Sequence, residues 1–279
     1  GLAAAFGLDP LLGLCMGSMP LVGGHGTSGS FGPLLETDYA VVGATTVALA
    51  AATYGLVSGS MMGGPIARAR VEKLHLKSTA AEEGNETAEV MPAVDGQKFT
   101  TSAMFLAVAI GLGTLIFTFF KDVCHLTFPT YIGAMLAAAA IRNIWDVQNK
   151  DLPMVEIDAL GGLSLNLFLS MAMMSLKLWQ LAALALPMIV ILLVQTVVMF
   201  LYANFVVFNV MGRDYEAAAM TTAFCGFGMG ATPNAMANMR ALVERYGAAP
   251  RAFFIVPLVG SLFVDFFNSM VLTTFMNFL

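Results

Sequence analysis

Apolar residues in this sequence gather into runs that are too long for the strands or amphipathic helices of a soluble protein. Each run approaches the ~20 residues that a helix needs to cross a bilayer. The runs that predict full membrane spans are residues 40–67, 100–120, 127–141, 159–176, 181–211 and 252–279. The pattern therefore predicts an all-α, polytopic transmembrane protein.

Two further apolar regions are interrupted by glycine clusters, GGHGT at 23–27 and GFGMGATP at 226–233. Glycine disfavours helix and proline lacks a backbone donor, so both clusters leave backbone N–H and C=O groups unpaired. Inside a bilayer such groups are tolerated only within protein or against a water-filled cavity. We therefore predict two re-entrant helical hairpins, at 9–36 and 214–239. A stripe of small residues for tight helix packing is the alternative explanation.

The placement of Lys and Arg supports the hairpins, because these residues are biased toward cytoplasmic loops. With segment 67–99 inside and 214–239 re-entering from the cytoplasm, only Lys121 and Lys177 of the 13 Lys and Arg lie outside. If 214–239 crossed the membrane instead, the three arginines that follow it would also move outside. By the same register, hairpin 9–36 starts and ends outside, so the two hairpins enter from opposite faces.

An internal repeat connects the two hairpins. An offset of 205 residues, applied without a gap, superposes Gly7 on Gly212, Asp9 on Asp214, Gly23 on Gly228 and Thr27 on Thr232. Opposed orientation with shared sequence is the signature of inverted-topology repeats. The chain begins within an apolar segment, so repeat one is expected to be incomplete at its N-terminal end.

The repeat divides the chain into three predicted parts. They are 1–66, the C-terminal part of repeat one with hairpin 9–36 and span 40–67; 67–99, a cytoplasmic linker; and 100–279, which holds span 100–120 and repeat two with hairpin 214–239. The linker is charged and polar, which is typical of a flexible connector. This register places the C-terminus outside.

Composition and charge narrow the function. Hydrophobic residues make up 58% of the chain and charged residues 11%, against about 25% charged residues in soluble domains. The net charge of −5 provides no basic stripe for phosphates, which excludes a nucleic-acid partner. The three cysteines, Cys15, Cys124 and Cys225, have no metal-ligand spacing and are interpreted as small apolar fillers. The lipid bilayer is the expected surrounding.

Broken helices supply groups that bind both an anion and a cation. Free N–H groups at the start of a half-helix carry partial positive charge, and free carbonyls coordinate a hard cation such as Na⁺. Thr27 and Thr232 end the two glycine clusters, where a hydroxyl either contacts the ligand or caps the second half-helix. Asn234 and Asn238 share one helix face and either line the cavity or bond neighbouring helices.

Asp265 is the strongest single candidate for a functional residue outside the two glycine clusters. A carboxylate midway along 252–279 is costly in lipid and marks a functional site by default, and Asn268 would lie beside it. Asp265 would pair with Na⁺ or with a substrate ammonium; a buried structural hydrogen bond is the alternative. His25 is interpreted as a neutral, hydrogen-bonded residue that lines the site, in preference to a proton relay.

The segments VGGHGTSGSF at 22–31 and CGFGMGATPNAMANM at 225–239 resemble the paired signatures of the sodium/glutamate symporter family. NLFLSMAMMSLKLWQLAALALPM at 166–188 is similar to the family's span between them. The resemblance implies Na⁺-coupled import of L-glutamate across a bacterial cytoplasmic membrane by two inverted repeats of five spans, each with one re-entrant loop. It also implies a homodimer, Na⁺ as the coupling ion, no organic cofactor and no enzymatic activity.

Carried over by position, the family's binding elements are 23–27 and 226–232 of this sequence. The candidate substrate-binding residues are Gly24, His25, Gly26, Thr27, Gly228, Gly230, Thr232 and Asn234. The candidate Na⁺ ligands are Asp265, Asn268, Gly23, Gly226 and Asn238.

Three other functions compete with glutamate symport. Acidic substrates that differ by one methylene are separated by only ~1 kcal/mol, so another dicarboxylate or amino acid is an alternative. An ion channel is a second, because Gly-Phe-Gly-Met-Gly offers a ladder of carbonyls. An intramembrane hydrolase using Ser58 or Asp265 is a third, but no second intramembrane aspartate is available to form a dyad.

Overall fold

A computed structural model of the chain describes residues 2–78, 94–124, 130–174 and 178–278. Helices make up most of these residues and no strand occurs among them, which confirms the all-α prediction. In chain order the helices are α1 (Leu2–Ala5), α2 (Pro10–Leu14), α3 (Ser18–Asp38), α4 (Ala44–Leu74), α5 (Gly96–Cys124), α6 (Thr130–Val147), α7 (Met154–Met174), α8 (Leu178–Tyr202), η1 (Ala203–Val207), α9 (Phe208–Val210), α10 (Tyr215–Gly228), α11 (Thr232–Tyr246), α12 (Pro250–Val259), η2 (Gly260–Val264) and α13 (Asp265–Phe278).

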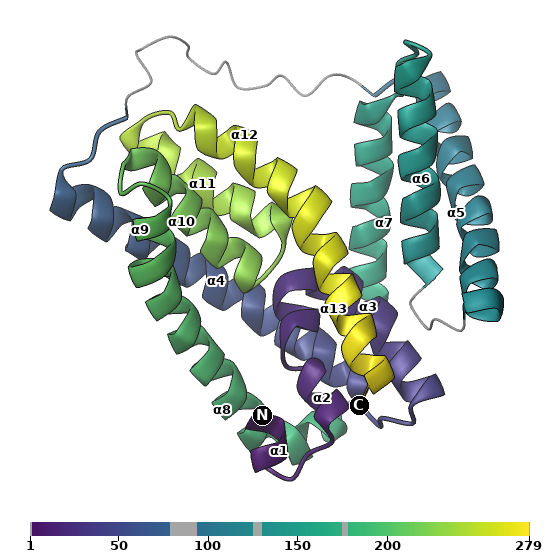
Figure 1. The fold of residues 1–279 in the computed structure, drawn as a ribbon, viewed down its shortest axis with the longest axis horizontal. Helices are drawn as coiled ribbons and strands as arrows, with labels where there is room; N and C mark the ends of the chain where they lie inside the picture. The colour runs from purple at the N-terminus through teal and green to yellow at the C-terminus, as the bar shows by residue number, and fades with distance from the viewer. Residues whose placement is uncertain (1, 79–93, 125–129, 175–177, 279) are drawn as a thin grey trace. The chain divides into compact units, whose positions relative to one another are not determined.

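The helices form two compact units (Figure 1). One unit combines Gly1–Asn85 with Leu176–Leu279, and the other is Glu86–Ser175. Both glycine clusters belong to the first unit, although about 200 residues separate them in the sequence. The first unit therefore contains every residue of the predicted site.

The second unit is a bundle in which α5 packs against α6 and α7. α5 and α6 approach closely at two glycines, since a methyl on Gly113 or on Gly133 would overlap the backbone of the opposite helix. Phe105 and Trp145 add an edge-to-face contact with ring centroids 5.2 Å apart. The outward side chains of α5, such as Leu115, are large, apolar and exposed, as on a lipid-facing surface.

Three stretches in the described residues are long and apolar enough to cross a membrane: Ala44–Leu74, Gly96–Val123 and Leu184–Val210. They correspond to the predicted spans at 40–67, 100–120 and 181–211 and support a polytopic membrane protein. The other three predicted spans form α6, α7 and the α12–α13 segment, with residues 127–129 and 175–176 outside the described part. α6 ends in polar turns that carry Arg142 and Asp146, and η2 divides the C-terminal segment.

Two long rods contain a π-helical turn each. Figure 1 shows α8, η1 and α9 as one continuous rod, and α12, η2 and α13 as another. A π-turn inserts one extra residue into a helix and frees backbone groups locally. At η1 the Arg70 guanidinium bonds one such backbone group: it donates to the carbonyl oxygen of Asn204 at 2.7 Å and to the Asn204 side-chain oxygen at 2.8 Å.

The first glycine cluster breaks α3. Gly24 has φ 62° and ψ −154°, which separates two helical arms within Ser18–Asp38. The preceding helix α2 begins with an N-cap, since the Asp9 carboxylate accepts from the Leu11 N–H at 2.8 Å. After the break, Ser28 Oγ donates to the Gly24 carbonyl at 2.7 Å. The break predicted from GGHGT is therefore present.

The second glycine cluster separates α10 from α11. The Asp214 carboxylate caps α10 by accepting from the Ala217 N–H at 2.7 Å, and the helix ends at Gly228. The Ala231 N–H then donates to the Gly226 carbonyl at 3.1 Å, which turns the chain before α11 begins. The two arms pack closely, because a methyl on Gly226 would lie 2.5 Å from the Ala235 backbone.

The two broken segments begin in the same way. Gly7 and Gly212, which the 205-residue offset pairs, both have positive φ, at 69° and 113°. Asp9 and Asp214, the next pair, both serve as N-caps. The local geometry thus follows the sequence offset at the start of both segments.

α4 packs against α3, α10 and α11. It continues to Leu74, into the segment expected to be a linker. Arg68 and Glu72 form an exposed ion pair one turn apart in these last turns, with Nε and Oε1 at 2.9 Å. Residues 79–93 of the predicted linker lie outside the described part.

Candidate functional site

The two helix breaks meet inside the first unit. A methyl placed on Gly24 would lie 3.0 Å from the Gly230 carbonyl oxygen and 3.4 Å from Ala231 Cβ. Gly24 and Gly230 are both buried. Two segments that the sequence marks independently as broken therefore contact each other at one buried point, which makes this point the candidate site.

α4 supports the second break with three small residues at four-residue spacing. A methyl on Gly55 would overlap the Met229 carbonyl oxygen, and one on Gly59 would lie 2.9 Å from the Cys225 carbonyl oxygen. A methyl on Gly63 would lie 2.6 Å from Asn238 Nδ2. The absence of side chains on this face of α4 lets α10 and α11 approach its backbone.

Asn234 and Asn238 bridge the second hairpin to α4. Asn234 Oδ1 accepts from Ser60 Oγ at 2.6 Å, and its Nδ2 donates to the Leu56 carbonyl at 3.4 Å. Asn238 Nδ2 donates to the carbonyls of Gly59 and Thr222, both at 3.2 Å. Both asparagines are buried, so these bonds satisfy groups that would otherwise be costly inside protein. The interhelical role considered for them is therefore present.

His25 follows the first break and is held by α4. Its Nε2 lies 3.0 Å from Thr53 Oγ1, and that hydroxyl donates to the Leu49 carbonyl at 3.0 Å. Because the hydroxyl proton is directed at Leu49, His25 Nε2 is the donor in its bond with Thr53. This bond orients the imidazole beside the first break, while its neutral state stays a prediction.

Thr232 carries a buried hydroxyl at the start of α11. Its Oγ1 has no hydrogen-bond partner among the described residues, and the same holds for Thr222 Oγ1. Buried side-chain oxygens in proteins are nearly always paired, so an unpaired hydroxyl beside a helix break fits a ligand atom. Thr27, the equivalent residue after the first break, is half-buried and packs against Gly23.

The oxygen atoms at the breaks suit a monovalent hard cation. The carbonyls of Gly24 and Gly26 accept from the hydroxyls of Ser28 and Ser30, and the Gly226 carbonyl accepts from the Ala231 N–H. No group of three or more His, Cys, Asp or Glu that could hold a metal ion occurs among the described residues. A cation here would be coordinated by carbonyl, hydroxyl and amide oxygens.

The other predicted site residues have different surroundings from those at the contact between the breaks. Gly26 is exposed with open space around its Cα, while Gly228 faces the thioether of Met199. Asn268 donates to the Ser18 carbonyl at 3.3 Å, so α13 lies against the start of α3. Asp265, one turn earlier, is exposed. The pair is thus attached to the first broken helix through Asn268.

Several residues that shape the site are absent from the sequence prediction. Thr53, Ser60 and Thr222 supply partners or neighbours to His25, Asn234 and Asn238. Glu216 is buried and accepts from the backbone N–H groups of Arg251 and Ala252, which caps α12. The repeated glycines at 55, 59 and 63 were the available signal for the α4 face, because their spacing places them on one side of a helix.

A helical membrane protein in which two broken helices meet around buried polar groups has the architecture of a secondary transporter. The sodium/glutamate symporter family model matches residues 1–248. The chain is 40% identical over 283 residues to the sodium/glutamate symporter of Escherichia coli (strain K12), covering 99% of this chain and 70% of the relative. It is 35% identical over 277 residues to that of Haemophilus influenzae, covering 96% and 68%.

The chain belongs to the sodium/glutamate symporter family, which is a family of transporters and not of enzymes. No solved structure matches the chain. The family assignment agrees with the resemblance of the two glycine motifs.

Proposed function

We propose that this protein imports L-glutamate together with Na⁺ across the bacterial inner membrane by alternating access. The contact between Gly24 and Gly230, which joins two helix breaks in one buried site, is the observation that carries the proposal. The names of its relatives support both the substrate and the coupling ion. The unpaired hydroxyl of Thr232 supports a ligand at that site.

Coupling to Na⁺ has a physical reason. Glutamate carries a net charge of −1, and moving it into a negative interior costs about 2.3 kcal/mol per 100 mV. One Na⁺ cancels that charge, and two or more make the membrane potential favour import. We therefore include at least two Na⁺ ions per glutamate in the proposal.

In this proposal the chain is built from two inverted repeats, whose re-entrant hairpins enter the membrane from opposite faces. The shared positive φ at Gly7 and Gly212 and the shared caps at Asp9 and Asp214 support this part of the proposal. Residues 67–99 then lie in the cytoplasm and the C-terminus outside. A homodimer completes the proposal, on the resemblance of the motifs to the family alone.

The binding roles follow from the helix ends. Substrate carboxylates would approach the N–H groups at the start of α11, around Thr232 and Asn234, and the arm that begins at His25. Na⁺ would take carbonyl oxygens at Gly23 and Gly226 and the amide oxygen of Asn238.

The structure counts against the channel alternative, because Gly226 to Gly228 belong to helix α10 and do not form an extended ladder of carbonyls.

Radiolabelled glutamate uptake into proteoliposomes that hold the full chain tests the proposal. We expect accumulation with an inward Na⁺ gradient and none with an inward K⁺ gradient, because only Na⁺ supplies the coupling energy. Excess unlabelled aspartate then reports how far the site discriminates by one methylene. Equal uptake under both gradients, or a flux that does not saturate with glutamate, would contradict Na⁺-coupled symport.

Asp265→Asn tests the proposed Na⁺ ligand in α13. Removing a ligand charge weakens cation binding, so we expect the Na⁺ concentration for half-maximal uptake to rise about tenfold. Asp158→Asn, which alters another exposed carboxylate at the start of an apolar helix, is the matched control and should leave it unchanged. An unaltered Na⁺ dependence in Asp265→Asn, at normal protein level, would assign Asp265 a structural role instead.

A further inference from the structure

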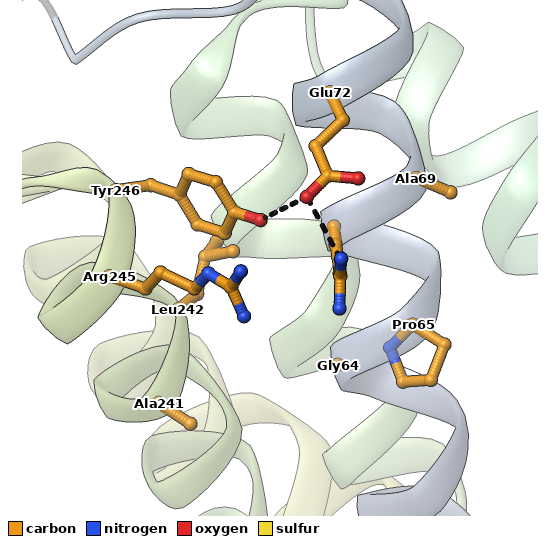
Figure 2. Close-up of a pocket in the computed structure, with 9 residues that line it drawn as sticks. Gly64, Pro65, Ala69, Glu72, Ala241, Leu242, Arg245 and Tyr246 are labelled. Carbon is orange, nitrogen blue, oxygen red and sulfur yellow. Dashed lines mark hydrogen bonds and ion pairs between the residues drawn. The ribbon is translucent and has the colours of Figure 1, made fainter.

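A cavity of about 450 Å³ opens between the C-terminal half of α4 and the end of α11 (Figure 2). Its size falls within the range of small-molecule sites in proteins. The residues that line it are Gly64, Pro65, Arg68, Ala69, Glu72, Ala241, Leu242, Arg245 and Tyr246. None of them was a candidate in the sequence, and none belongs to the site at the breaks.

The charged groups of the cavity are arranged around one carboxylate. Glu72 Oε1 accepts both from Arg68 Nε at 2.9 Å and from the Tyr246 hydroxyl at 2.8 Å. Figure 2 shows Arg245 reaching from α11 into the gap toward α4, and its guanidinium lies 5.6 Å from the centre of the Tyr246 ring. With two arginines and one glutamate, the cavity keeps one positive charge in excess.

The cavity adjoins the site at the breaks. Gly64 directly follows Gly63, whose Cα faces Asn238 and Thr222. Leu242 lies one helical turn beyond Asn238 on α11. The cavity also lies at the end of α4 that carries the basic residues and extends into the 67–99 segment, which the positive-inside rule places in the cytoplasm. In this register it lies on the cytoplasmic side of the second hairpin.

We propose that this cavity is a second, cytoplasmic site for small dicarboxylates such as glutamate, on the route between the breaks and the cytoplasm. Arg245 and Arg68 bind a substrate carboxylate, and the Tyr246 hydroxyl donates to it. Glu72 already places a carboxylate against Arg68 and Tyr246, so the same donors suit a carboxylate of the ligand after Glu72 turns away. The inference rests on the proposed function.

Binding at this cavity is weak and reversible. The side chains of Arg68 and Glu72 are 55% and 47% exposed, and pairs at such exposure contribute little because water screens them. Weak binding suits a release site, because a tight one would retain the substrate. The site changes the apparent affinity for glutamate on the cytoplasmic side and leaves the outer side unchanged.

Arg245→Gln, compared with Arg240→Gln, tests the cavity in transport. Arg240 is an exposed arginine of the same helix that does not line the cavity. In oriented membrane vesicles we expect Arg245→Gln to raise the KM for efflux of internal glutamate about fivefold, the size of one exposed charge contact, with the KM for external glutamate unchanged. Arg240→Gln should leave both constants unchanged. Equal effects of the two variants, or an unchanged internal KM in Arg245→Gln, would overturn the inference, while wild-type uptake in the same vesicles reports separately on the proposed function.

A second measurement addresses binding without transport. Ala241→Cys, combined with Cys124→Ala, places a thiol in the cavity, and the two other cysteines, Cys15 and Cys225, are buried. An excess of positive charge should make an anionic thiosulfonate react faster with this thiol than a cationic one of similar size, and millimolar glutamate should slow the reaction. No preference for the anionic reagent, or no protection by glutamate, would overturn the inference. A slower reaction in vesicles with phosphatidylglycerol than in pure phosphatidylcholine, with no further effect of glutamate, would overturn the inference and assign the cavity to a lipid phosphate instead.

Discussion

Gly24→Ala is expected to reduce Na⁺-driven glutamate uptake at least about tenfold at normal protein level. Gly24 has φ 62° and ψ −154°, a backbone conformation that is essentially restricted to glycine and costs other residues about 1–3 kcal/mol. The added methyl would also lie 3.0 Å from the Gly230 carbonyl oxygen. Strain and contact act together on the point where the two breaks meet. The measurement is the initial uptake rate divided by the amount of protein in the membrane.

Gly7→Ala is the matched control for Gly24→Ala. Gly7 also has positive φ, at 69°, but a methyl there meets nothing within 4 Å. It therefore tests the cost of a left-handed backbone, about 1–2 kcal/mol, without a contact at the breaks. Gly7→Ala should lower stability slightly and keep most of the uptake. Loss of uptake in both variants, or in neither, would show that the meeting of the breaks does not control transport.

The sequence predicted the breaks because their causes are local. Glycine and proline act on the backbone at their own positions, so GGHGT and GFGMGATP identify where two helices must stop. The caps at Asp9 and Asp214 are local in the same sense, since each carboxylate bonds an N–H two or three residues later. Features of this kind can be derived from one sequence without an alignment.

The partners of the site residues could not be predicted in the same way. Ser60 and Asn234 are 174 residues apart, and His25 and Thr53 are joined only because α3 packs against α4. The order in which helices pack decides which hydroxyl meets which amide, and residue pattern alone does not fix that order. The π-turn at η1 is a further case, because its residues continue an apolar run and include no glycine or proline that would predict an irregular turn.

Gly55, Gly59 and Gly63 of α4 combine a pattern that is visible in the sequence with contacts that only the structure shows. Their four-residue spacing is visible in the sequence, yet it is equally typical of tight helix packing and of a site that needs backbone contact. The structure shows that both apply to the same face: Gly55 and Gly59 contact the second break, and Gly63 contacts Asn238. A small-residue stripe, which the sequence analysis weighed as an alternative for the two glycine clusters, is present on a different segment, α4, beside the breaks.

Gly63→Ala is expected to lower uptake about tenfold or more. A methyl on Gly63 would lie 2.6 Å from Asn238 Nδ2, 2.7 Å from Thr222 Oγ1 and 3.1 Å from the Thr222 carbonyl oxygen. Relieving this overlap requires α4 to move away from α10 and α11, and overpacking of this kind costs about 1–3 kcal/mol. The hydrogen bonds of Asn238 to Gly59 and Thr222 would lengthen at the same time. Initial uptake rate and thermal unfolding in detergent are the two measurements.

Gly64→Ala separates this contact from a general effect on α4. Both glycines belong to the same helix, and alanine improves helix propensity at each by about 1 kcal/mol. A methyl on Gly64 meets nothing within 4 Å, so only the gain in helix propensity remains. Gly64 also lines the cytoplasmic cavity, so this variant is a control for stability: we expect Gly64→Ala to unfold at the same or a higher temperature than the wild type and Gly63→Ala at a lower one. If Gly63→Ala unfolded like Gly64→Ala and kept wild-type uptake, close contact between α4 and the second hairpin would not be required for transport.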